Sequence, residues 1–289
     1  VSHGHSHPEL LKVLHEQSSR LALTSRAFYT DTLGSFLETI TSLSNFDMAL
    51  PMNSGAEAVE TAIKAARRWG YRSKNIKSGK AEIIVADGNF HGRTTTIISF
   101  SSSPNSKEDF GPLTPGFISV EFGSAKAIGE MINENTAAVL IEPIQGEGGI
   151  IVPPENYLPE VRELCTKNNV LMILDEVQSG LGRTGKMFAF EHSNIQPDGL
   201  ILGKALGGGF MPVSCFLSSS EVMQWLTPGS HGSTFGGNPL AAAIGKRALE
   251  LLEEESLIEN SRVLGEYFKN ALINMKSEII CFVIIFQDL

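Results

Sequence analysis

Short runs of apolar residues alternate with longer amphipathic stretches along most of the chain. Residues 137–141 and 170–174 are unbroken apolar runs, the pattern of strands that are buried on both faces of a sheet. Residues 57–70 and 157–167 instead place apolar side chains at helical spacing. No internal repeat interrupts the alternation, so the sequence predicts an α/β fold with a mixed, mostly parallel sheet and helices on both faces. Further strands are expected at 49–52, 81–86, 117–120, 199–202 and 213–217, and further helices at 8–21, 31–43, 125–133, 238–252 and 257–275.

Two opposite charges stand at the ends of apolar strands. Asp175 follows the run 170–174, and Lys204 follows the short run 199–202. Open α/β sheets bind ligands at the carboxyl ends of their strands, so both side chains are expected near a site. One interpretation is a buried ion pair. The other is that Asp175 faces a pyridinium nitrogen while Lys204 forms a Schiff base, the pairing that pyridoxal 5'-phosphate (PLP) requires.

Three other segments offer polar or aromatic groups beside expected strands. Residues 53–56 form a small-residue turn between a strand and a helix, which can present backbone N–H groups to a phosphate but also occurs in any such turn. Phe90 is either a core aromatic or a surface for a cofactor ring. Glu142 and Glu147 follow one strand, and such a pair either supports acid–base chemistry or is a solvated surface charge.

Composition excludes several classes of protein. The chain of 289 residues is 42% hydrophobic and 19% charged, which are globular values, and its net charge of −9 argues against nucleic-acid and anionic-membrane partners. No apolar run approaches the ~18 residues of a membrane span. Cys165, Cys215 and Cys281 are a sparse and odd set, typical of reduced thiols in an intracellular protein. His3 to His7 alternate with other residues, but no metal site is predicted.

Several motifs together resemble one known family. They are LDEVQSGLGRTG at 174–185, GKALGGG at 203–209 and HGSTFGGNP at 231–239, supported by GNFHGRT at 88–94 and IEPIQGEGGI at 141–150. This series is similar to that of the class III aminotransferases, which are PLP enzymes of fold type I. The resemblance runs from Val1 to Glu278 and implies that the chain is the large domain of a fold type I PLP-dependent transferase.

The resemblance also implies roles for individual residues. Lys204 would carry PLP and act as the catalytic base, and Asp175 would keep the ring nitrogen protonated. Arg93 would receive a substrate carboxylate, and Glu147 would act as a gate that pairs with an arginine of a C-terminal domain. The remaining cofactor contacts would be Phe90 and Val177 on opposite ring faces, Gln178 at the phenolic oxygen, Ser54, Gly55 and Ala56 at the phosphate, and Thr234 at the phosphate of a neighbouring subunit.

The similarity is greatest to family members that act on ornithine. It implies transfer of the δ-amino group of ornithine to 2-oxoglutarate, giving glutamate 5-semialdehyde and glutamate, by a homodimer or larger homo-oligomer. Three alternatives stay open: an aminotransferase for acetylornithine or 4-aminobutyrate, an aminomutase that needs no 2-oxoglutarate, and an inactive relic. His91 is less certain as a site residue, since relatives carry another aromatic residue there.

The same comparison predicts the domain organisation. Residues 1–30 would be the remnant of an N-terminal segment, 31–255 the PLP-binding large domain, and 256–289 the start of a C-terminal domain, so the chain is expected to be truncated at both ends. The last residues, 277–289, no longer resemble the family. We therefore expect the chain by itself to turn over little ornithine. A targeting segment would also be missing, which leaves the mitochondrial matrix and the cytoplasm as expected locations.

Overall fold

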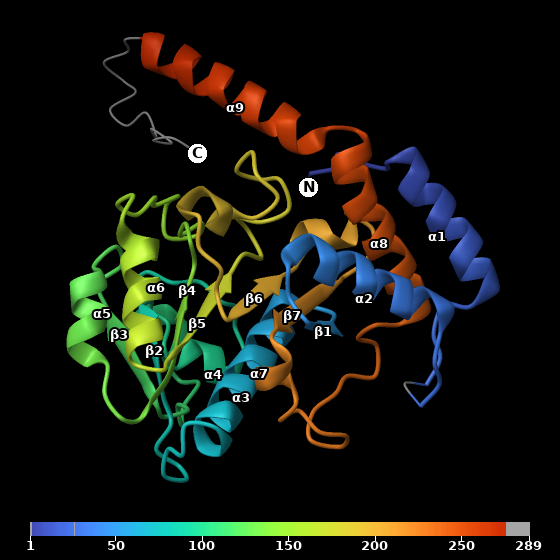
Figure 1. The fold of residues 1–289 in the computed structure, drawn as a ribbon. Helices are drawn as coiled ribbons and strands as arrows, with labels where there is room; N and C mark the ends of the chain where they lie inside the picture. The colour runs from blue at the N-terminus through green and yellow to red at the C-terminus, as the bar shows by residue number, and fades with distance from the viewer. Residues whose placement is uncertain (1, 26, 276–289) are drawn as a thin grey trace.

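A seven-stranded sheet forms the centre of the molecule. The computed structural model in Figure 1 describes residues 2–25 and 27–275. The strand order is β1-β7-β6-β5-β4-β2-β3, and the five strands from β6 to β3 run parallel, while β7 runs antiparallel to both neighbours. The predicted mixed, mostly parallel sheet is therefore confirmed. The strands are β1 (Met48–Met52), β2 (Glu82–Ala86), β3 (Phe117–Val120), β4 (Thr136–Ile141), β5 (Leu171–Asp175), β6 (Gly199–Leu202) and β7 (Ser214–Ser218).

Helices cover both faces of the sheet, as predicted. Along β5, Leu171 and Ile173 pack in the cluster that contains the apolar side of α3, whereas Met172 and Leu174 pack in the cluster that contains α2, α5, α6 and α8. This explains why β5 is apolar without alternation, because both of its faces are buried. The helices are α1 (Pro8–Arg20), α2 (Asp31–Ser44), α3 (Gly55–Arg72), α4 (Thr95–Ile98), α5 (Ala125–Met131), α6 (Tyr157–Lys167), α7 (Ser220–Met223), α8 (Pro239–Glu254) and α9 (Leu257–Asn274).

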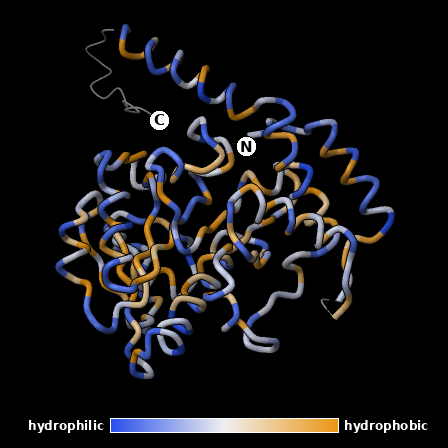
Figure 2. The backbone as a smooth tube through the Cα atoms, viewed as in Figure 1, coloured by the Kyte–Doolittle hydropathy of each residue, from blue (hydrophilic) through white to orange (hydrophobic). Residues whose placement is uncertain are grey.

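The two ends of the described chain differ in packing. Helix α1 lies on α8, where Leu10 is fully buried against Ile244 and Ala248. Helix α9 extends away from the sheet, and none of its residues is buried (Figure 1). Hydrophobic and hydrophilic segments alternate along α9 in Figure 2. Its exposed large side chains include Tyr267 and Phe268. The predicted domain boundaries stay predictions.

The structure also bears on the cysteine and histidine expectations. Cys165 and Cys215 are buried free thiols, and burial raises the pKa of the Cys165 thiol to about 12. Cys281 and the apolar segment 279–286 lie outside the described residues. Nε2 of His3 donates a hydrogen bond to the carbonyl of Ala248 at 2.7 Å. No group of three possible metal ligands occurs in the described part of the chain. Among residues 2–25 and 27–275, no helix is long and apolar enough to cross a membrane.

Candidate active site

The carboxyl ends of β5 and β6 meet the N-terminus of α3 at a small cavity. The cavity has a volume of about 170 Å³. Seven of the eleven residues that the sequence predicted for the site line it together with three others, although their segments lie far apart in the chain. The lining residues are Gly55, Ala56, Phe90, His91, Gly92, Glu142, Asp175, Val177, Gln178 and Lys204. We call this cavity the slot.

Lys204 stands at the mouth of the slot in a strained backbone conformation. It follows β6 directly and has a φ of +44°, in the left-handed region that non-glycine residues avoid. Such strain is found where the surrounding structure imposes it, and functional sites are common examples. The exposed Nζ donates a hydrogen bond to Oε1 of Gln178 at 3.0 Å. A flexible amine is therefore held toward the slot by a neighbour on the β5 loop.

Asp175 is the buried anion of the slot. Only 5% of its surface is exposed. Its Oδ1 accepts the backbone N–H of Val177 at 3.0 Å, and its Oδ2 lies 2.7 Å from Nδ1 of His91. The ion-pair partner of Asp175 in the described chain is thus His91 and not Lys204. The interpretation of Asp175 and Lys204 as a simple buried ion pair is wrong, since both line the cavity with other partners.

The first turn of α3 supplies backbone donors to the slot. Ser54 caps the helix: its Oγ accepts the N–H of Glu57, while Oε2 of Glu57 accepts the N–H of Ser54 at 2.8 Å. This capping box uses the Ser54 donor, so Ser54 acts as the cap and does not line the slot. The N–H groups of Gly55 and Ala56 have no hydrogen-bond partner in the described structure and sit at the positive end of the helix dipole.

Apolar and aromatic side chains form the walls of the slot. Val177 packs so closely on the α3 turn that a Cβ added to Gly55 would lie 3.1 Å from its Cγ1. Glycine at position 55 therefore allows the phosphate turn to approach the β5 loop. Phe90 is half-buried, and the guanidinium carbon of Arg93 lies 5.9 Å from the centroid of its ring. Arg93 is exposed beside the slot, where a substrate carboxylate could reach it.

Two predicted residues lie away from the slot. Thr234 is exposed in the loop before α8 and does not line the slot, and that loop is fastened to the same chain. Oγ of Ser233 accepts a hydrogen bond from Asn53 at 3.0 Å, and Nε2 of His231 lies 2.7 Å from Oγ1 of Thr61. Glu147 is exposed on the loop after β4. The roles of Thr234 and Glu147 stay predictions.

The sequence reasoning undervalued Glu142 and His91. Glu142 lines the slot with 5% of its surface exposed, so it is not a solvated loop acid. Its Oε2 accepts the backbone N–H of Phe90 at 3.0 Å, and burial raises its pKa to about 7. Its position directly after a fully apolar strand was the available signal. His91 was noticed beside Phe90, but no local pattern connects it with Asp175.

A larger cavity of about 610 Å³ adjoins the slot and shares Val177, Gln178 and Lys204 with it. Arg183 and Thr184 of the glycine-rich β5 loop line it as well, and the sequence reasoning assigned no role to either. Because Lys204 borders both cavities, its amine can reach a group held in either one. The slot and this cavity together form the candidate active site.

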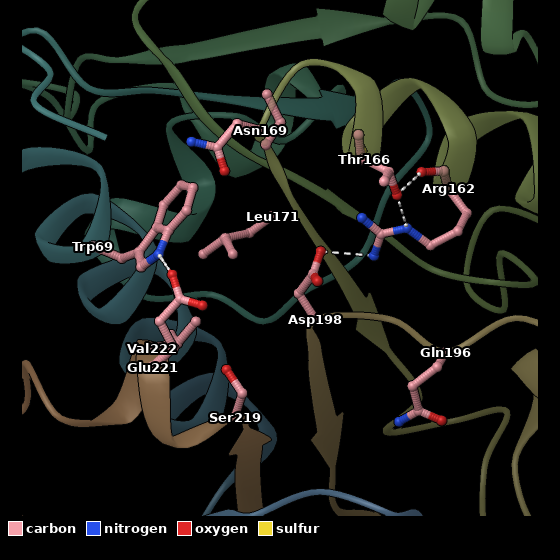
Figure 3. A pocket seen from close by; sticks show the side chains of 12 residues that line it. Trp69, Arg162, Thr166, Asn169, Leu171, Gln196, Asp198, Ser219, Glu221 and Val222 are labelled. Atoms are coloured by element: carbon pink, nitrogen blue, oxygen red, sulfur yellow. Dashed lines mark hydrogen bonds and ion pairs between the residues drawn. The ribbon is translucent and has the colours of Figure 1, made fainter. Parts of the chain in front are cut away.

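A further cavity, of about 420 Å³, lies at the amino ends of β5 and β6, where Asn169, Leu171 and Asp198 are among the residues that line it (Figure 3). Its charged groups are engaged with neighbours. Arg162 pairs with Asp198 at 2.7 Å, and Nε1 of Trp69 donates to Glu221 at 3.4 Å. The charged side chains Arg162, Asp198 and Glu221 therefore all have partners within the protein, and none of the residues that the sequence predicted for the site lines this cavity.

This fold and site define a class of protein. The chain belongs to the class III aminotransferase family, because the model of that family, described as Aminotransferase class-III, matches residues 1–282. The family resemblance of the motifs is thereby confirmed.

Individual relatives narrow the comparison. Ornithine aminotransferase 2 of Staphylococcus saprophyticus is 56% identical over 272 residues, which are 94% of this chain and 69% of the relative. A structure of the Toxoplasma gondii ornithine aminotransferase, with partial occupancy of PLP at its active site, has a TM-score of 0.93 and 44% identity, and the match covers 94% of this chain and 64% of that one. Acetylornithine aminotransferase of Elizabethkingia anophelis matches with a TM-score of 0.84 and 47% identity, over 94% of this chain and 66% of its own. The chain thus spans about two thirds of the length of these proteins.

The raised pKa of Glu142 predicts a specific dependence of stability on pH. The ordinary value is 4.5, and the folded value is about 7 because burial disfavours the charged form. Between these values the folded state holds a proton that the unfolded state releases, so the free energy of unfolding falls as pH rises through this window. Relative to Glu142→Gln, the parent protein should lose about 1–3 kcal/mol between about pH 5 and pH 8, measured by denaturant unfolding.

The exposed Glu147→Gln serves as the control, because it removes the same charge from the same loop without a buried group. Its stability should follow that of the parent at every pH. Parallel curves for the parent and Glu142→Gln would show that Glu142 is ionised throughout and that burial does not govern its proton.

Proposed function

We propose that the whole protein is a PLP-dependent aminotransferase that moves the δ-amino group of ornithine to 2-oxoglutarate, giving glutamate 5-semialdehyde and glutamate. The observation that carries the proposal is the amine of Lys204 held at the mouth of a slot that contains the buried carboxylate of Asp175. A primary amine for covalent attachment and an anion for a ring nitrogen are the two groups that PLP chemistry needs from a protein.

The residues present fit PLP. The phosphate is an anion, and the unpartnered N–H groups of Gly55 and Ala56 at a helix N-terminus favour it. The ring is flat and apolar on its faces, and Phe90 and Val177 line the slot where it would lie. When bound, PLP supplies an electron sink for the negative charge that develops on the substrate carbon.

The chain's own residues would then orient the substrate and move protons. Asp175 would keep the ring nitrogen protonated, because a buried carboxylate favours a neighbouring cation. The amine of Lys204 would act as the base that removes a proton from the substrate carbon that bears the amino group. Gln178 already accepts a hydrogen bond from that amine, and on the resemblance it also faces the phenolic oxygen.

Substrate carboxylates need cationic or hydrogen-bonding partners near the larger cavity. Arg93 stacks beside Phe90 and offers a planar guanidinium to one carboxylate. Glu147 is exposed on the neighbouring loop, and its proposed role is to pair with an arginine and so admit or exclude the second substrate. Ornithine delivers its amino group in the first half-reaction, and 2-oxoglutarate accepts it in the second.

A second donor, acetylornithine, is favoured by one observation. The Elizabethkingia anophelis acetylornithine aminotransferase shares 47% of its aligned residues with this chain, against 44% for the Toxoplasma gondii ornithine enzyme. Ornithine remains the proposed donor because Staphylococcus, Oceanobacillus and Macrococcus ornithine aminotransferases are 53–56% identical to the chain.

The activity of the full-length protein tests the proposal. Ornithine with 2-oxoglutarate should give glutamate 5-semialdehyde and glutamate, and Lys204→Ala should lower the rate by more than about a thousandfold while the fold is retained. Acetylornithine, 4-aminobutyrate and a reaction without 2-oxoglutarate are run in parallel. A higher kcat/KM with another donor would replace ornithine, product formed without 2-oxoglutarate would indicate a mutase, and full activity of Lys204→Ala would remove the catalytic assignment.

We further propose that two copies share their sites, with Thr234 reaching the phosphate bound by the partner subunit. The support is that Thr234 and its neighbour Phe235 are exposed, whereas Ser233 beside them is tied to Asn53 close to the phosphate turn. Phe28 and Tyr29 are also exposed aromatic residues, which suit burial against a second copy.

Mixed dimers test this sharing. Thr234→Ala and Lys204→Ala proteins should each be nearly inactive alone. In the heterodimer, one site lacks both Thr234 and Lys204 and the other site has both. About half of the sites should therefore be active. If heterodimers form and no activity returns, Thr234 does not act across the interface.

A further inference from the structure

His91 is the most deeply buried titratable group of the slot, and the function described so far does not use it. Its side chain has 0% exposure, and its Nδ1 lies 2.7 Å from Oδ2 of Asp175. The two residues are 84 positions apart in the chain, so the contact comes from the fold. Phe100 packs against the imidazole ring, with the ring centroids 5.8 Å apart and the planes at 53°.

The hydrogen-bond pattern around Asp175 determines where the proton of His91 lies. Oδ1 of Asp175 already accepts the N–H of Val177, and a carboxylate oxygen cannot donate, so Nδ1 of His91 must be the donor to Oδ2. Nε2 of His91 is buried and has no partner in the described structure. The contact with Asp175 and the charge of Glu142 outweigh burial and raise the pKa of His91 above its ordinary value.

These two hydrogen bonds orient the carboxylate of Asp175. Each oxygen accepts one bond and keeps a second lone pair, so the carboxylate still has acceptor capacity for a ring N–H in the slot. Without His91, the N–H of Val177 would be the one remaining hydrogen bond to the carboxylate among those of the described residues. A carboxylate that must accept a hydrogen bond from a ring nitrogen binds that nitrogen less strongly when the orientation of the carboxylate varies.

We propose that His91 is a positioning residue, which fixes the Asp175 carboxylate by donating Nδ1–H to it and so holds the anion in the orientation that binds the ring nitrogen of PLP. This inference rests on the proposed function, because it assumes that the slot holds PLP. His91 acts through Asp175, with which it makes its hydrogen bond.

A purely structural role of His91 makes a different prediction, which a pair of substitutions separates. His91→Asn keeps an amide N–H close to the place of Nδ1 but removes the titrating ring. His91→Phe keeps a ring of similar bulk but removes the donor. If His91 only fills space, the His91→Phe protein should bind PLP more tightly than the His91→Asn protein. If His91 holds Asp175, the His91→Asn protein should bind PLP more tightly.

The first measurement is PLP binding to the cofactor-free protein, followed by the absorbance of the bound cofactor. His91→Phe should weaken binding about tenfold or more, and His91→Asn should stay within about threefold of the parent. Phe100→Leu is the matched packing control, since it alters the contact with the His91 ring and leaves the hydrogen bond, and it should also stay within about threefold. Binding by His91→Phe equal to the parent, or binding by His91→Asn as weak as by His91→Phe, would overturn the proposal.

The second measurement needs no cofactor. Nitrogen NMR of the histidine rings should show a protonated Nδ1 on His91 that titrates above the ordinary range of histidine, and Asp175→Ala should bring that titration down. An unchanged His91 titration in Asp175→Ala would show that the contact does not exist in solution. Failure of the parent protein to bind PLP would overturn the proposed function as a whole. If the parent protein and His91→Phe bind PLP equally well, only the proposed role of His91 is overturned.

Discussion

A buried carboxylate at the end of a central strand is the constraint on which this site depends. Asp175 is 5% exposed, and an unpaired charge in that position would be costly. Its partners come from two segments: the N–H of Val177 from its own loop, and His91 from the loop after β2. Satisfying this single charge brings the GNFHGRT loop over the β5 end, and with it Phe90 and Arg93. The arrangement of the side chains in the site thus follows from the need to give the buried Asp175 carboxylate hydrogen-bond partners.

The other functional groups lie at the same carboxyl ends of the strands because of the sheet topology. Strands β4, β5 and β6 run parallel, so their carboxyl ends deliver Glu142, Asp175 and Lys204 to one side. The N-terminus of α3 reaches the same side with the N–H groups of Gly55 and Ala56, which have no partner among the described residues. The cavity at the amino ends of β5 and β6 is polar too, but its charged side chains form ion pairs such as that of Arg162 with Asp198. Position at the carboxyl ends of three parallel strands therefore distinguishes the candidate active site from this other cavity.

Local sequence patterns predicted the strands, most helices and the residues at strand ends, because burial on two faces leaves a continuous apolar run, as in β5. They could not predict contacts between distant segments. The hydrogen bond of His91 to Asp175 and the burial of Glu142 arise only when β2, β4 and β5 lie side by side. Ser54 was expected at the phosphate, but its own helix uses it as a cap. Thr234 shows a different limit, since its predicted contact belongs to a second copy of the chain.

The central claim is that the slot binds PLP and that Lys204 is the residue that carries it. The direct measurement is to incubate the protein with PLP, fix the linkage with borohydride, digest the protein and locate the added mass among the lysine peptides by mass spectrometry. The account predicts modification at Lys204 in nearly every labelled molecule, because its strained position holds the amine toward the slot. Labelling spread over surface lysines such as Lys126, with none on Lys204, would contradict it.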